Sequence, residues 1–179
     1  MINKIFFYCC KIIDTVFHSQ KLKIFYFKKR GIKFTGDKNL PPHIFSDISK
    51  MEPWLISIGH NTTVAGNVSF ITHDNSIAKL KLGCSNLFGK IVIGNNCFIG
   101  ENSTILYGVR IANNVIVAAG SVVTKSFEEE NIIIGGNPAK IISNWNQLKD
   151  KVESNNLNRN INRRVFKKNK FSDDFLVKR

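Results

Sequence analysis

The stretch IVIGNNCFIGENSTILYGVRIANNVIVAAGSVVTKSF, residues 91–127, repeats an aliphatic residue every six positions. The same spacing starts earlier, at Ile58, and is interrupted over residues 75–92. A period of six matches neither a helix nor simple strand alternation. It is typical of short parallel strands joined by tight corners, with one inward side chain on each face of a three-faced coil. The residues that lead each unit are Ile58, Val64, Phe70, Ile93, Ile99, Ile105, Ile111, Val117 and Val123.

Two further positions of the repeat support this interpretation. Three residues after each leading position stands a residue that tolerates a left-handed backbone, as a tight corner requires: Asn61, Asn67, Asn96, Asn102, Gly108, Asn114 and Gly120. The next residue must fit beside the corner and is always small or β-branched: Thr62, Val68, Cys97, Ser103, Val109, Val115 and Ser121. The corner exceptions are Ser126, where the repeat ends, and His73. His73 is therefore the first candidate for chemistry.

The segments around the repeat define three expected parts. Residues 1–31 read as a basic amphipathic helical segment, and residues 32–139 as the solenoid, with residues 75–92 looped out. Residues 32–57 should be irregular, because prolines exclude regular central strands and because Ser46 and Glu52 break the phase. Residues 140–179 should form a short helix over 141–151 and a basic, asparagine-rich tail.

The net charge of +13 is concentrated at the two ends of the chain. Residues 1–50 carry +7, residues 51–139 carry −1, and residues 140–179 carry +7. Such ends suit an anionic membrane surface, nucleic acid or a phosphate-bearing ligand, or serve solubility alone. The chain shows no nucleic-acid module signature, which argues against that partner. The N-terminal segment then either packs on the end of the solenoid or lies on anionic lipid.

Other targeting and metal signals are missing from the sequence. No stretch approaches the roughly 20 apolar residues of a spanning helix, and the N-terminus does not resemble a signal peptide. The four cysteines form neither a disulfide framework nor a metal motif. We therefore expect a cytoplasmic protein without a metal, and the basic N-terminal segment leaves peripheral contact at the inner face of the membrane open.

The stretches IGHNTTVAGNVSFITHD (58–74), IVIGNNCFIGENSTILYGVRI (91–111), VIVAAGSVVTK (115–125) and GNPAK (136–140) carry a family resemblance. They resemble the left-handed β-helix (hexapeptide-repeat) acyltransferases, in the branch of maltose and galactoside acetyltransferases that includes capsule and O-antigen O-acetyltransferases. The resemblance covers about residues 50–145. It implies an all-β solenoid that is a left-handed parallel β-helix, a homotrimer, acetyl-CoA as acyl donor and a saccharide acceptor.

The histidine can be interpreted in two ways from the residues alone. His73 either caps a turn or acts as a general base, for which an imidazole that titrates near neutrality is suited. The resemblance favours catalysis, because Thr72-His73 matches the context of the family's catalytic histidine. Asp74 is expected to orient the imidazole or to raise its basicity. Cys84 is expected to be structural, because no second histidine stands near it in the sequence to act as a base.

For the coenzyme, the resemblance implies a pantetheine arm between neighbouring coils of two subunits. The matching positions are Ala119, Thr124, Lys125 and Lys140, and a lysine suits phosphate as a point charge; Lys125 can equally be a solvated corner residue. The predicted function is an acetyl-CoA-dependent O-acetyltransferase acting on a sugar hydroxyl of a surface polysaccharide or its precursor. Two alternatives stay open: an N-acetyltransferase of a nucleotide-linked amino sugar, and a non-catalytic β-helix tethered by its basic ends.

Overall fold

The computed structural model describes residues 19–48, 50–81 and 83–154. The expectations for residues 1–18 and for the tail from residue 155 onward lie outside these ranges. The chain divides into two units, residues 1–142 and 143–179. The first unit contains the whole stack of coils, and the second contains, in its described part, the end of the last strand and a helix.

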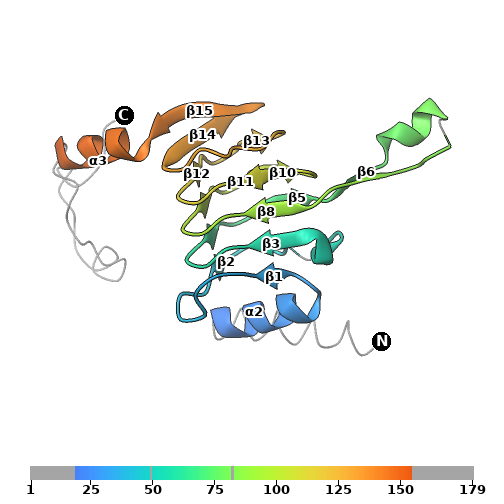
Figure 1. The fold of residues 1–179 in the computed structure, drawn as a ribbon, viewed down its shortest axis with the longest axis horizontal. Helices are drawn as coiled ribbons and strands as arrows, with labels where there is room; N and C mark the ends of the chain where they lie inside the picture. The colour runs from blue at the N-terminus through green and yellow to red at the C-terminus, as the bar shows by residue number, and fades with distance from the viewer. Residues whose placement is uncertain (1–18, 49, 82, 155–179) are drawn as a thin grey trace, which may run out of the picture. The chain divides into compact units, whose positions relative to one another are not determined.

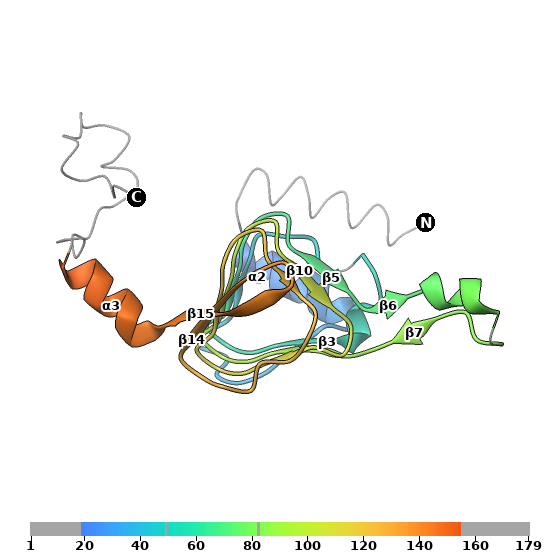
Figure 2. The ribbon, with the colours of Figure 1, turned by 90° about the horizontal axis from the view of Figure 1, so that it is seen from above.

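Three parallel sheets form the walls of the solenoid, and Figure 2 shows the coils stacked with a triangular outline. Along the coil, strands of successive turns stack side by side in these sheets, and the first coil contributes a strand to two of them. In spatial order the first contains β1 (Lys33–Phe34), β3 (Ile56–Ile58), β8 (Ile91–Ile93) and β11 (Arg110–Ile111). The second contains β13 (Val122–Val123), β10 (Thr104–Leu106) and β5 (Ser69–Ile71). The third contains β15 (Ala139–Asn144), β14 (Ile132–Gly136), β12 (Ile116–Val117), β9 (Phe98–Ile99), β4 (Thr63–Val64) and β2 (His43–Ile44).

The period of six is confirmed position by position. All nine leading residues are buried in one core, and all seven Asn or Gly corners have positive φ, between 51° and 77°. The small residues beside the corners are buried as well. Asparagine side chains also link successive coils at one edge, where Asn61 Nδ2 donates to Asn96 Oδ1 and Asn96 Nδ2 donates to Asn114 Oδ1, both at 2.8 Å.

An arm leaves the coil between β5 and β8 and projects from the solenoid (Figure 1). It consists of β6 (His73–Asp74), the 3₁₀ helix η2 (Ser76–Leu80) and β7 (Leu87–Phe88), and β6 and β7 pair antiparallel. One regular coil takes 18 residues, as the pairing of Val92 with Arg110 shows. The coil that contains the arm takes 35 residues, from Ser57 to its partner Val92, so the arm inserts 17 residues. The predicted limits of 75–92 are corrected, because the arm begins two residues earlier and residues 91–92 already belong to β8.

Both ends of the coil differ in detail from expectation. Helix α2 (Gln20–Lys29) lies across the N-terminal end, and Gly31 follows it with φ +100°. The irregular first coil contributes β1 and β2, two-residue strands at sheet edges, and the 3₁₀ helix η1 (Pro53–Leu55). At the other end β14 extends the stack past residue 128. The helix expected over 141–151 is α3 (Trp145–Ser154), because residues 141–144 belong to β15. None of the helices in the described ranges has the length and apolar character needed to cross a membrane.

Candidate active site

His73 lies where the chain leaves the second coil for the arm. Its backbone is extended within β6 and pairs with Phe88 of β7, so the corner conformation expected at this position is wrong. The physical reason is that the turn is replaced by the start of a two-stranded ribbon. The histidine side chain stays 29% exposed, which leaves the ring accessible beside the base of the arm.

Glu52 is the carboxylate that meets this ring. Its Oε2 atom lies 2.9 Å from Nδ1 of His73. The same oxygen accepts a hydrogen bond from Thr72 Oγ1 at 2.5 Å, and the backbone N–H of Glu52 donates back to that hydroxyl at 3.2 Å. Thr72 is fully buried. Thr72 therefore holds both the carboxylate and the backbone N–H of Glu52.

The hydrogen bonds among Glu52, Thr72 and His73 indicate which nitrogen of the histidine ring carries the hydrogen. Donation from Thr72 is the main cause that lowers the pKa of Glu52, and His73 adds to it. An ionised carboxylate only accepts hydrogen bonds, so Nδ1 of His73 carries the hydrogen in this contact. Nε2 of the neutral ring is then unprotonated and able to accept a proton from a substrate.

Sequence reasoning did not assign a role to Glu52. It immediately precedes η1 in the first coil, 21 residues before His73, and only the stacking of coils brings the two together. The available signal was its failure to fit the six-residue phase, where a charged residue replaces an inward apolar one. That signal indicates a departure from the repeat but does not name the partner.

Asp74 has partners other than the imidazole. Its Oδ1 accepts from the backbone N–H of Ser76 at 2.8 Å, and its Oδ2 accepts from the hydroxyl of Tyr107 at 3.3 Å. The Ser76 N–H is also the main cause that lowers the pKa of Asp74. These contacts fasten the arm to the next coil. An orienting role for Asp74 stays a prediction, whereas the carboxylate that accepts the hydrogen bond from the histidine ring is that of Glu52.

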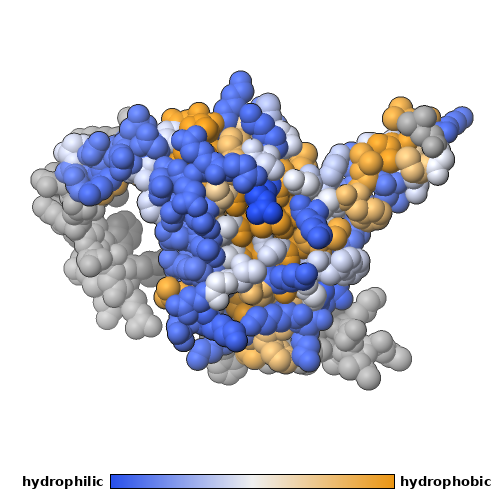
Figure 3. Space-filling model, in the orientation of Figure 1, coloured by the Kyte–Doolittle hydropathy of each residue, from blue (hydrophilic) through white to orange (hydrophobic). Residues whose placement is uncertain are grey.

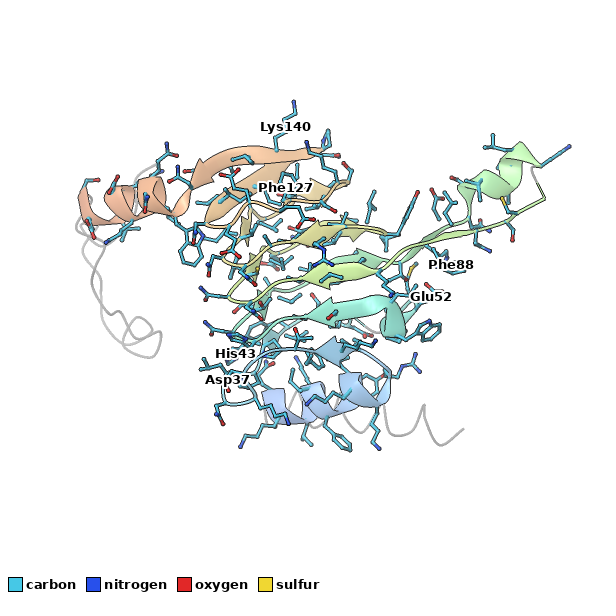
Figure 4. The ribbon with its side chains drawn as sticks, viewed as in Figure 1. Asp37, His43, Glu52, Phe88, Phe127 and Lys140 are labelled. Carbon is cyan, nitrogen blue, oxygen red and sulfur yellow. The ribbon has the colours of Figure 1, made fainter. Side chains whose placement is uncertain are left out.

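Phe88 forms the other wall beside the histidine. Its ring centroid lies 5.6 Å from that of His73 with the planes inclined by 50°, and its side chain is 59% exposed. Figure 4 shows Phe88 and Glu52 at the same side of the solenoid, near the base of the arm. An exposed aromatic side chain next to a candidate base is suited to contact a substrate.

The coenzyme candidates lie elsewhere on the coil. Ala119 precedes β13, Thr124 and Lys125 follow it, and all three are exposed. The Nζ atom of Lys125 lies 5.7 Å from the ring centroid of Phe127. Lys140 is exposed on β15, toward the end of the coil opposite α2 (Figure 4). Thr124 and Lys125 are thus neighbours, and the structure does not bring Lys140 to His73.

Metal-ligand side chains and cysteines were the remaining candidates for a site. Among the residues that the structure describes, no group of His, Cys, Asp and Glu side chains could hold a metal ion. Cys97 is buried, as expected, and burial raises the pKa of its thiol. Cys84 is exposed between η2 and β7.

Comparisons with known proteins agree with this architecture. The family model described as the hexapeptide repeat of succinyl-transferase matches residues 90–125. Protein CapG of Staphylococcus aureus is 45% identical over 130 residues, which cover 69% of this chain and 74% of CapG. A putative lipopolysaccharide biosynthesis O-acetyl transferase, WbbJ of Escherichia coli K12, is 34% identical over 127 residues, which cover 65% of this chain and 63% of WbbJ.

A solved galactoside acetyltransferase in complex with coenzyme A superimposes with a TM-score of 0.50 at 27% identity, covering 66% of this chain and 62% of that one. The match to CapG exceeds two thirds of that protein at high identity. The six-residue coil, the family model and these relatives lead to one assignment: the chain belongs to the hexapeptide-repeat acetyltransferase family.

Proposed function

We propose that this protein is an acetyl-CoA-dependent O-acetyltransferase that acetylates a sugar hydroxyl of a surface polysaccharide or its precursor, with His73 as general base. The observation that carries the proposal is the 2.9 Å contact between Glu52 Oε2 and His73 Nδ1 beside the arm. It holds an accessible imidazole through Nδ1, which leaves Nε2 as the nitrogen that can accept a proton. The coil that presents it is that of an acetyltransferase family.

The chemistry follows from this geometry. Nε2 of His73 takes the hydroxyl proton as the sugar oxygen attacks the thioester carbonyl, and the imidazolium that forms is stabilised by the Glu52 carboxylate. As the carbon–sulfur bond breaks, the same nitrogen returns the proton to the departing sulfur. One acetyl ester and one free thiol result, and the histidine is regenerated.

Similarity to named relatives supports the choice of donor and acceptor. The galactoside enzyme was solved with coenzyme A, and WbbJ is described as a putative lipopolysaccharide O-acetyl transferase. We extend both properties to this chain as a proposal. Ala119, Thr124, Lys125 and Lys140 are the proposed coenzyme contacts. Phe88, whose ring lies beside that of His73, is a proposed acceptor contact, and Asp74 is a proposed orienting residue.

A homotrimer is part of the proposal. The outer face of the third sheet presents Phe98, 44% exposed, in register with Thr63 and Ile116 of the neighbouring strands. We propose that this exposed aromatic side chain and its cross-strand neighbours form a subunit contact. Static light scattering of the purified chain reports the assembly directly, and a monomer that transfers acetyl groups at full rate would contradict it.

The decisive test is thiol release from acetyl-CoA with a panel of sugars, comparing wild type with His73→Ala. Loss of acceptor-dependent release in His73→Ala, with binding of acetyl-CoA retained, is the expected result. Equal activity in the two proteins would remove His73 from the mechanism. Each hydroxyl acceptor is paired with its amino counterpart, so preferential acetylation of the amino sugar would favour N-transfer. Absence of release with every acceptor, together with no binding of acetyl-CoA, would favour the non-catalytic alternative.

A further inference from the structure

Helix α2 has two faces with different environments. Ile24 and Phe27 are buried against the end of the coil. On the same side Gln20 Oε1 accepts from the backbone N–H of Ile44 at 2.9 Å, and Lys23 Nζ donates to the carbonyl of Ile44 at 3.2 Å. This face satisfies the backbone N–H and carbonyl of Ile44 in the edge strand β2. It accounts for the position of the helix.

The opposite face is apolar and basic together. Leu22 and Phe25 remain 39% and 49% exposed. Lys21, Lys28 and Lys29 are exposed at positions that helical spacing places around them. We call these five residues the outer face of α2. In Figure 3 apolar residues lie among hydrophilic ones at the lower end of the molecule, where Figure 1 places this helix.

The charge on the outer face is unopposed along the chain. No aspartate or glutamate occurs between residues 15 and 36. Asp37, the first carboxylate after the helix, accepts from the backbone N–H of Asn39 at 2.8 Å. The Nζ atom of Lys29 lies 5.7 Å from the ring centroid of Phe25, so the cation and the aromatic ring form one surface.

We propose that the outer face of α2 binds the surface of an anionic phospholipid membrane. Lysines around exposed leucine and phenylalanine side chains are the pattern of helices that lie in the interfacial plane, where ammonium groups meet lipid phosphates and apolar tips enter the acyl boundary. Because α2 covers the end of the solenoid, the coil stands on the membrane through this helix. The binding does not depend on the transferase reaction.

Nucleic acid fits this surface less well. Phosphates would pair with the three lysines equally and an unpaired base could stack on Phe25, but a nucleic acid offers no apolar partner to Leu22. A lipid surface uses both the charges and the apolar side chains. The two partners therefore differ in the part of the face on which binding depends.

Co-sedimentation of the full chain with two kinds of vesicle tests the proposal. One kind is phosphatidylcholine alone, and the other is phosphatidylcholine mixed with phosphatidylglycerol. We expect binding only to the mixed vesicles, with an affinity that falls as salt is raised. Lys28→Gln/Lys29→Gln should lower partitioning by roughly 25-fold, since each lysine near an anionic surface contributes about a fivefold factor. Phe25→Ala should lower it at constant charge.

The matched control is Lys149→Gln/Lys151→Gln, which removes the same charge from the C-terminal part of α3, a helix of the same ten-residue length. It should bind like wild type, and all variants should keep the wild-type melting temperature and the wild-type rate with a soluble acceptor. Equal losses in the two double variants would reduce the effect to net charge and overturn the proposal. So would binding of the wild type to a single-stranded oligonucleotide that depends on Lys28 and Lys29, with no binding to mixed vesicles.

Discussion

Replacing Glu52 by Gln should slow acetyl transfer without weakening the binding of acetyl-CoA. The substitution keeps the length and shape of the side chain and removes only its charge. In the proposed mechanism His73 gains a proton in the transition state, and the carboxylate oxygen 2.9 Å from Nδ1 stabilises the positive ring. A hydrogen bond of this charged type contributes about 2 kcal/mol. The pair is partly exposed, at 29% for His73 and 20% for Glu52, so the low-dielectric upper bounds do not apply.

The expected loss is about 30-fold in kcat, because each 1.36 kcal/mol changes a rate about tenfold. The assay is thiol release at saturating acetyl-CoA and acceptor. KM for acetyl-CoA should be unchanged, since the proposed coenzyme contacts lie on other strands. Glu153→Gln removes the same charge from α3 and should keep the wild-type rate. A wild-type kcat in Glu52→Gln would refute the assignment of Glu52 as the residue that positions His73.

The same contact predicts the direction of a pH effect on stability. The pKa of Glu52 is lowered from its ordinary value of 4.5 in the folded chain, first by the hydrogen bond from Thr72. A carboxylate with a lowered pKa contributes its full stabilisation when the pH is above the ordinary pKa. That contribution to the free energy of unfolding is lost as the pH falls through the lowered pKa. Urea unfolding should therefore show wild type losing stability more steeply than Glu52→Gln below pH 4.5. Parallel curves would contradict the lowered pKa.

Three further changes test the scaffold and the coenzyme site. Gly89→Ala should destabilise by about 1–3 kcal/mol in urea unfolding, because a Cβ there would lie 2.4 Å from the backbone nitrogen of Gly108; Gly66→Ala, which meets only a flexible side chain at 3.3 Å, should cost far less. Asn96→Ala should lower the free energy of unfolding by about 2 kcal/mol, and Asn96→Gly should lower it less. Glycine keeps the left-handed corner at φ +54° and loses only the side-chain hydrogen bonds. Equal losses in the two variants would contradict this reasoning. Lys125→Ala should raise KM for acetyl-CoA about tenfold with kcat nearly unchanged, as loss of one phosphate contact predicts, and an unchanged KM would leave Lys125 as a solvated corner residue.

The periodic part of the fold could be predicted in detail because its information is local. An inward aliphatic, a left-handed corner and a small neighbour recur within every six residues, and each position is read from side-chain size or backbone tolerance alone. The burial of Ile105 and the positive φ of Asn102 needed no knowledge of distant contacts. The limits of the arm could not be predicted in this way. Residues 91–92 come directly after a stretch with loop-like composition, yet they pair with β3 and β11.

The candidate site also combines a residue that local sequence predicts with partners that only tertiary contacts bring to it. The sequence by itself singled out His73 as the candidate base, since the histidine interrupts a local pattern and stands in a family context. Only the tertiary structure decided what contacts it, because Glu52 lies 21 residues earlier and joins it through the stacking of the first coil on the second. It also decided that His73 lies in a strand instead of a corner and that Asp74 bonds to Ser76 and Tyr107. Spacing within a repeat fixes where a side chain enters the coil, whereas the register between coils fixes which side chains meet.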